Sequence, residues 1–68
     1  SDMPARPSVL DPDILREQLP EIGEHLASAC QTLFRYPNPD AAEHLARALE
    51  AARQHALELA DSLRRAQP

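Results

Sequence analysis

The stretch DAAEHLARALEAARQHALELADSL, residues 40–63, decides the fold of this chain. It contains no glycine or proline and is rich in alanine, leucine, glutamate and arginine, which have the highest helix propensities. Its apolar residues recur at alternating intervals of three and four, which places them in one narrow stripe along a helix. The stripe consists of Ala42, Leu45, Leu49, Ala52, Ala56, Leu59, Leu63 and Ala66. Such a stripe must be buried, and we expect the rest of the chain to cover part of it.

A second amphipathic segment precedes this stretch. At its start, Asp11 can accept a bond from a free backbone N–H, Pro12 has no N–H to leave unpaired, and Asp13 suits the positive end of a helix dipole. The apolar positions that follow have the same spacing. They are Leu15, Leu19, Ile22, Leu26, Ala29 and Leu33, and Ile14, Cys30 and Phe34 widen the stripe on one flank.

Pro20 interrupts this first helix. Its ring would clash with the carbonyl of Arg16, at a cost of about 3 kcal/mol for an interior proline. The helix can kink at Pro20 and continue, or a short helix over residues 12–19 can end where a second begins at Pro20. Because the apolar spacing passes through the proline unchanged, we favour a kink or tight break with both parts packed on the same neighbour.

The segment YPNPD, residues 36–40, separates the two helical segments. Its prolines push the residues before them out of helical geometry, and Asp40 with Glu43 matches a capping box for the second helix. A connection this short folds the second helix back antiparallel to the first. The predicted fold is therefore an all-α antiparallel helical hairpin. In it, Leu45, Leu49, Leu59 and Leu63 are expected to pack against Leu19, Ile22, Leu26 and Leu33.

The chain has 68 residues, which allows one small domain. We assign residues 11–66 to the hairpin and residues 1–10 to a flexible lead-in, whose first two residues resemble the remnant of an expression tag. Val9 and Leu10 are expected to contact the first helical turn. A single cysteine and the lack of a Cys/His cluster leave association with another chain as the expected source of further stability.

The composition narrows the classes of partner. All seven basic residues are arginines, and twelve alanines and ten leucines accompany them, a bias typical of GC-rich bacterial genomes. A net charge of −4 argues against non-specific attraction to nucleic acid or an anionic membrane. No apolar run approaches the ~20 residues of a membrane span, and no signal-peptide segment is recognisable, so we predict a cytoplasmic protein.

The candidate chemical groups favour no catalytic or metal site. His44 and His55 are eleven positions apart, about 16 Å along a helix, which is too far for one metal ion. Glu21 and His25 have a ligand-like spacing, but two ligands make a weak site, and solvated histidines are the favoured interpretation. Cys30 is expected to be a small buried apolar residue rather than a reactive thiol. We therefore predict no enzyme activity and no cofactor.

The function predicted from these patterns is a non-enzymatic protein–protein interaction module, used in assembly, docking or chaperone-like binding. Its partner would be a second copy, giving a four-helix bundle, or a heterologous helical protein. The predicted interface consists of Phe34, Tyr36, Leu57, Leu10 and Cys30. The alternative is a small dimeric transcriptional or phage-type regulator that binds nucleic acid, although Glu43 and Glu50 cancel the field of the nearby arginines. A small enzyme or phosphorelay element is a third and weaker alternative.

Overall fold

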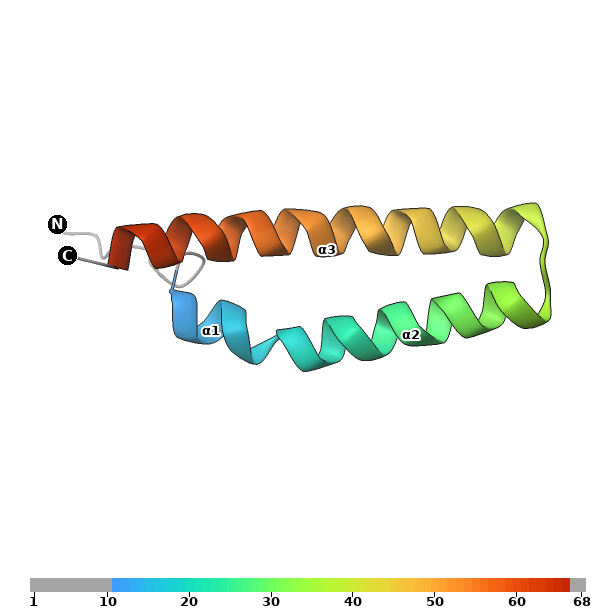
Figure 1. Ribbon diagram of the computed structural model, residues 1–68, viewed down its shortest axis with the longest axis horizontal. Coiled ribbons are helices and arrows are strands. Elements are labelled where there is room, and N and C mark those ends of the chain that lie inside the picture. Colours follow the sequence, from blue (N-terminus) through green and yellow to red (C-terminus); the bar gives the residue numbers. More distant parts are fainter. Residues whose placement is uncertain (1–10, 67–68) are drawn as a thin grey trace, which may run out of the picture.

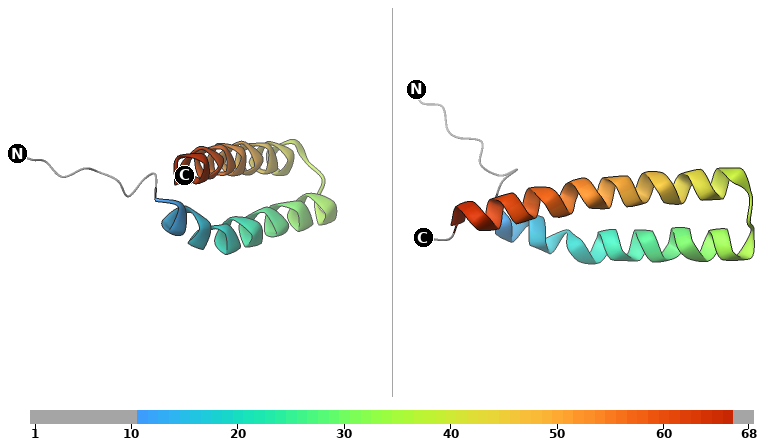
Figure 2. Two further views of the ribbon diagram at one scale, coloured as in Figure 1. Left: turned by 60° about the vertical axis from the view of Figure 1, so that its left-hand side comes forward. Right: turned by 45° about the horizontal axis from the view of Figure 1, so that its top comes forward.

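The computed structural model describes residues 11–66, which form three α-helices: α1 (Pro12–Glu17), α2 (Leu19–Arg35) and α3 (Pro39–Ala66). Helices α1 and α2 follow one another along one side of α3 and run antiparallel to it (Figures 1 and 2). Both pack against α3, and no strand occurs among the described residues. The predicted all-α hairpin with a first helix broken near Pro20 is confirmed. The expectations for the lead-in, including Val9 and Leu10, lie outside the described residues.

The break in the first helix falls at Gln18. Helix α1 starts as expected, because the Oδ1 atom of Asp11 accepts a hydrogen bond from the backbone N–H of Asp13 at 2.9 Å. Pro20 then occupies the first turn of α2, where its missing N–H costs nothing. The N–H of Gln18 donates to the carbonyl of Leu15 at 3.3 Å and so closes α1. Of the two interpretations, the structure has two helices separated by a tight break.

The start of α3 differs from the sequence-based expectation. Asn38, rather than Asp40, caps the helix, because its Oδ1 accepts a hydrogen bond from the N–H of Ala41 at 2.8 Å. The Nδ2 of Asn38 donates to the carbonyl of Tyr36 at 3.1 Å and ties the loop to the same residue. Pro39 therefore takes the first helical position, which it favours. The capping box predicted from Asp40 was wrong because the helix begins two residues earlier, at Pro39.

The core between the helices is narrow and rests on small side chains. On α3 the residues that face α2 and α1 are buried or half-buried. They are Ala41, Leu45, Ala48, Ala52, His55, Leu59 and Ser62. On the other side, Leu15 and Ala29 are buried, and Ile22, Leu26 and Leu33 are half-buried. Among the described residues, no large side chain is completely buried.

This packing corrects one part of the predicted core. Leu45 and Leu59 face the partner helices as expected, but Leu49 and Leu63 are exposed, and Leu19 is 40% exposed on the opposite helix. The predicted and the observed stripe on α3 have every seventh residue in common. Between these shared positions, the inward-facing residue is the one immediately before the predicted residue. Buried alanines such as Ala48 let the two backbones approach closely, so the structure turns the leucine flank outward.

Candidate functional site

Two sides of α3 differ in chemistry, and Ala48 marks the boundary between them. Ala48 is buried against α2. His44 lies one helical turn before it and Leu49 immediately after it, so the two side chains point about 140° apart around the helix. Both are exposed. The line of contact with α2 therefore has histidine on one side and leucine on the other.

The same arrangement recurs on α2 around Ala29. This alanine is buried, His25 lies one turn before it, and Cys30 follows it directly. Because the helices are antiparallel, like flanks meet on the same side of the hairpin. The contact between the His25 and His44 rings confirms this directly. We call the side with the histidines the histidine edge, and the opposite side the apolar face.

The apolar face follows a seven-residue spacing along α3. Its members are Leu19 and Cys30 from α2 and Ala42, Leu49, Ala56 and Leu63 from α3. All of them are exposed. The next positions outward on α3 are Ala46, Arg53, Ala60 and Arg64, so two charged residues, both arginines, border this surface. A surface of this composition resembles the central part of a protein–protein interface, where charged residues are depleted.

Four of the five predicted interface residues are described, and all four are exposed: Phe34, Tyr36, Leu57 and Cys30. Phe34 is 87% exposed and Leu57 51% exposed. By helical geometry, Leu57 lies two residues after the inward-facing His55 and so points away from α2. Tyr36 is exposed at the hairpin tip, and Leu10 lies outside the described residues. Cys30 is exposed in the single chain, on the flank where the sequence places it, so its predicted burial requires a partner.

The histidine edge joins all three helices. The rings of His25 and His44 meet edge to face, with their centres 5.4 Å apart and their planes at 69°. Further along, His55 Nε2 lies 2.7 Å from the carbonyl oxygen of Leu15. A carbonyl oxygen only accepts hydrogen bonds, so Nε2 carries the proton and donates it. The same carbonyl also accepts the N–H of Gln18 at 3.3 Å, so His55 adds a second hydrogen bond that ties α3 to the end of α1.

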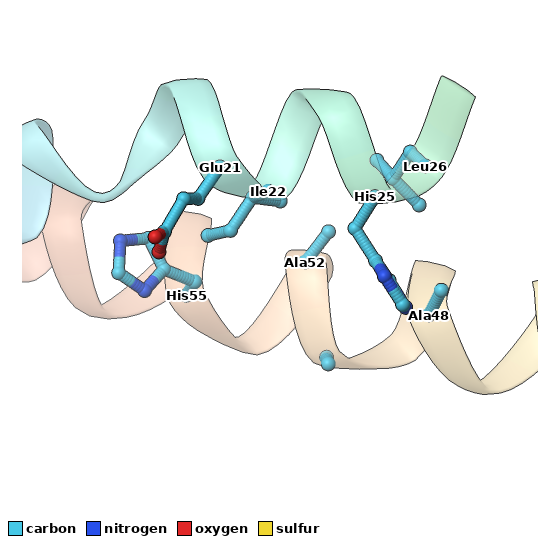
Figure 3. Close-up of a pocket in the computed structure, with 8 residues that line it drawn as sticks. Glu21, Ile22, His25, Leu26, Ala48, Ala52 and His55 are labelled. Atoms are coloured by element: carbon cyan, nitrogen blue, oxygen red, sulfur yellow. The ribbon is translucent and has the colours of Figure 1, made fainter. Parts of the chain in front are cut away.

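An open groove lies along the histidine edge between α2 and α3. Its volume is about 470 Å³, and its walls are mostly aliphatic, with Glu21, His25 and His55 as the polar residues (Figure 3). In Figure 3 the His25 side chain extends from α2 toward α3 near Ala48. The sequence analysis missed this clustering because His25 belongs to a different helix from His44 and His55. Only the antiparallel register reveals it.

Side chains that could ligate a metal ion are sparse along residues 11–66. No group of three or more histidine, cysteine, aspartate or glutamate side chains gathers there in a way that would hold a metal ion. The histidine pair is thus the densest set of ligand-type nitrogens in that range. None of the three described helices is long and apolar enough to cross a membrane.

The arginines of α3 are paired within the helix. The observed pairs are Glu43–Arg47 at 3.8 Å, Glu50–Arg53 at 3.5 Å, and Asp61 with Arg64 at 3.9 Å and with Arg65 at 3.0 Å. Each is solvent-exposed and contributes little to stability, but together they offset the positive charge that a nucleic-acid surface requires.

Comparisons with known proteins add no family assignment. Neither the protein-family models nor the curated proteins nor the solved structures contain a match to this chain.

Proposed function

We propose that the protein is a non-enzymatic helical interaction module whose apolar face binds a second copy of the same chain, giving a four-helix bundle. The observation that carries the proposal is the exposed, seven-residue-spaced row Ala42, Leu49, Ala56 and Leu63 on α3. The module would serve in assembly or docking, and the surface that binds the partner is the apolar face.

The thin core supports the need for a partner. Among residues 11–66, Leu15 is the one large apolar side chain that is buried, and the other buried apolar residues are alanines. Chains below about 70–80 residues rarely obtain more than 3–5 kcal/mol from a single core. Leu49 and Leu63, about half exposed, would each contribute about 1 kcal/mol if a partner covered the remaining surface.

The order of residues on the apolar face favours a second copy over an unrelated partner. If two α3 helices pack antiparallel about a two-fold axis between residues 52 and 53, each leucine of one copy faces an alanine of the other. Leu49 then lies opposite Ala56, and Leu63 opposite Ala42. Large residues opposite small ones interdigitate well in helix packing.

Charge is compatible with this arrangement. Arg53 is the charged residue nearest the proposed axis, and it would meet its own copy there. Its guanidinium lies 3.5 Å from the carboxylate of Glu50 in the same helix, which offsets the like-charge repulsion. A two-fold contact of this kind is isologous and closes after two copies, so it predicts a dimer rather than a filament.

A residue swap tests the proposed register. Leu49→Ala removes a contact that occurs twice in the dimer, and at about 1 kcal/mol each the dissociation constant should rise about thirtyfold. Ala56→Leu alone should weaken the dimer by placing leucine against leucine. The double variant Leu49→Ala/Ala56→Leu restores a large residue opposite a small one and should recover most of the affinity. Sedimentation or light scattering over a dilution series, with helicity followed by circular dichroism, measures all three.

Leu57→Ala is the matched control, because Leu57 has the same exposed fraction as Leu49 and lies on the same helix. The proposed register leaves Leu57 outside the contact, whereas the sequence analysis predicts it inside. An effect at Leu49 alone would support the apolar face as the interface. An effect at Leu57 alone would move the interface to the outer surface of α3, and a well-folded monomer at every concentration would refute self-association.

A further inference from the structure

The rings of His25 and His44 are in contact across two helices. The two residues lie on different helices and are nineteen positions apart in the sequence, yet their ring centres are 5.4 Å apart. Both side chains are exposed, so ions in solution can reach them. Neutral imidazole is the commonest metal ligand in proteins. A pair held by two packed helices is therefore partly organised for chelation before any ion arrives.

The separation of the rings agrees with the geometry of zinc. A zinc ion about 2.0–2.1 Å from a coordinating nitrogen lies about 3.2 Å from the ring centre, and two such rings at the tetrahedral angle have centres about 5.2 Å apart. The observed 5.4 Å differs from this by a few tenths of an ångström. The rings meet edge to face at 69°, so binding also requires that the side chains rotate until one nitrogen of each ring points at the ion, which needs no shift of either helix.

We propose that His25 and His44 form a two-histidine binding site for a divalent transition-metal ion of the zinc class, which cross-links α2 to α3. Imidazole nitrogens suit zinc, copper and nickel, whereas magnesium and calcium require oxygen ligands. Water completes the coordination, because no third ligand-type side chain joins the pair among the described residues. Cys30 does not contribute, because it lies on the apolar face.

The site acts on the stability of the hairpin. Its two ligands come together only when α2 and α3 are packed, so the ion binds the folded chain in preference to the unfolded chain. At a hundredfold excess of free ion over its dissociation constant, the folding equilibrium shifts about a hundredfold toward the folded state. The site lies on the side opposite the apolar face, so it does not depend on the proposed self-association.

Thermal unfolding of the tag-free protein at about pH 7.5, with zinc chloride and with magnesium chloride, tests the site. Zinc should raise the unfolding midpoint of the wild-type chain, with one ion bound per chain by calorimetric titration, and magnesium should not. His25→Ala and His44→Ala should each lose the zinc-dependent rise. His55→Ala is the matched control. It also removes an imidazole from the same edge, but it should keep the zinc-dependent rise even though it lowers the starting midpoint.

Three results would overturn the proposal. They are no change in the wild-type midpoint at millimolar zinc, a zinc-dependent rise that survives in His25→Ala or His44→Ala, and a ratio of one ion per two chains. The last would mean that the ion bridges two chains rather than two helices of one chain. Circular dichroism of each variant without metal establishes that it is folded before zinc is added. A monomeric wild-type chain that zinc stabilises would refute the self-association and leave this site standing.

Discussion

Leu15→Ala should destabilise the hairpin more than any other single truncation of an apolar side chain in α1 or α2. Leu15 is 5% exposed and is the side chain through which α1 is anchored in the core. The change removes three carbon atoms, worth about 2.4 kcal/mol at about 0.8 kcal/mol per buried carbon. No large side chain is completely buried among the described residues, so the neighbours of Leu15 can relax into the space and the cost should stay near 2.5 kcal/mol, at the lower end for such changes. That loss lowers the folded-to-unfolded ratio about sixtyfold.

Ile14→Ala provides the comparison, because it removes the same number of carbon atoms from the neighbouring position. Ile14 is 40% exposed, and alanine improves helix propensity there, so its cost should be about 1 kcal/mol. Urea unfolding followed by circular dichroism at one fixed protein concentration measures both changes. Hydrogen exchange of residues 12–17 shows whether α1, which is too short to be stable alone, detaches first. Equal costs for the two variants would refute the assignment of Leu15 as the anchor of α1.

Two further changes test the local structure. Asn38→Ala removes the acceptor for the N–H of Ala41 and should lower the free energy of unfolding by about 1 kcal/mol. Asn38→Asp keeps an acceptor at this position and should retain most of the wild-type stability. Equal losses for the two variants in urea unfolding would contradict the cap. Gly23→Ala should raise the stability by about 0.5–1 kcal/mol in thermal unfolding, because a Cβ atom at Gly23 meets nothing within 4 Å and the residue is helical. A destabilised Gly23→Ala protein would show that another chain fills that space.

The elements of the fold could be predicted from the sequence because their signals are local. Asp11 and Pro12 mark the start of α1, and the prolines at 37 and 39 mark the turn. Each signal depends on the chemistry of one residue or its near neighbours along the chain. The break near Pro20 follows from the missing N–H and the bulk of one ring. The exact cap of α3 was missed because Asn38 and Asp40 are both good capping residues two positions apart.

The rotation of α3 could not be predicted in the same way. The apolar spacing allows either the Leu49 flank or the Ala48 flank to face α2, and hydrophobicity alone favours the leucine. The choice depends on how closely two backbones can approach, which is a property of both helices together. Sequence spacing also cannot bring His25 next to His44, because their contact depends on the register that the loop imposes. The candidate site was therefore less predictable than the fold.

The observed rotation has an energetic consequence that favours a partner. Had Leu49 and Leu63 faced α2, the isolated hairpin would have buried more apolar surface, at about 25 cal/mol per Å². The chain instead buries Ala41 and Ala48 and keeps the contact between His55 and the carbonyl of Leu15. A sequence under selection for a stable isolated hairpin would gain by placing leucines inward. The chain nevertheless keeps leucines on the outer flank, and each has an alanine at the two-fold related position. Burial of the apolar face in an assembled dimer would explain both features.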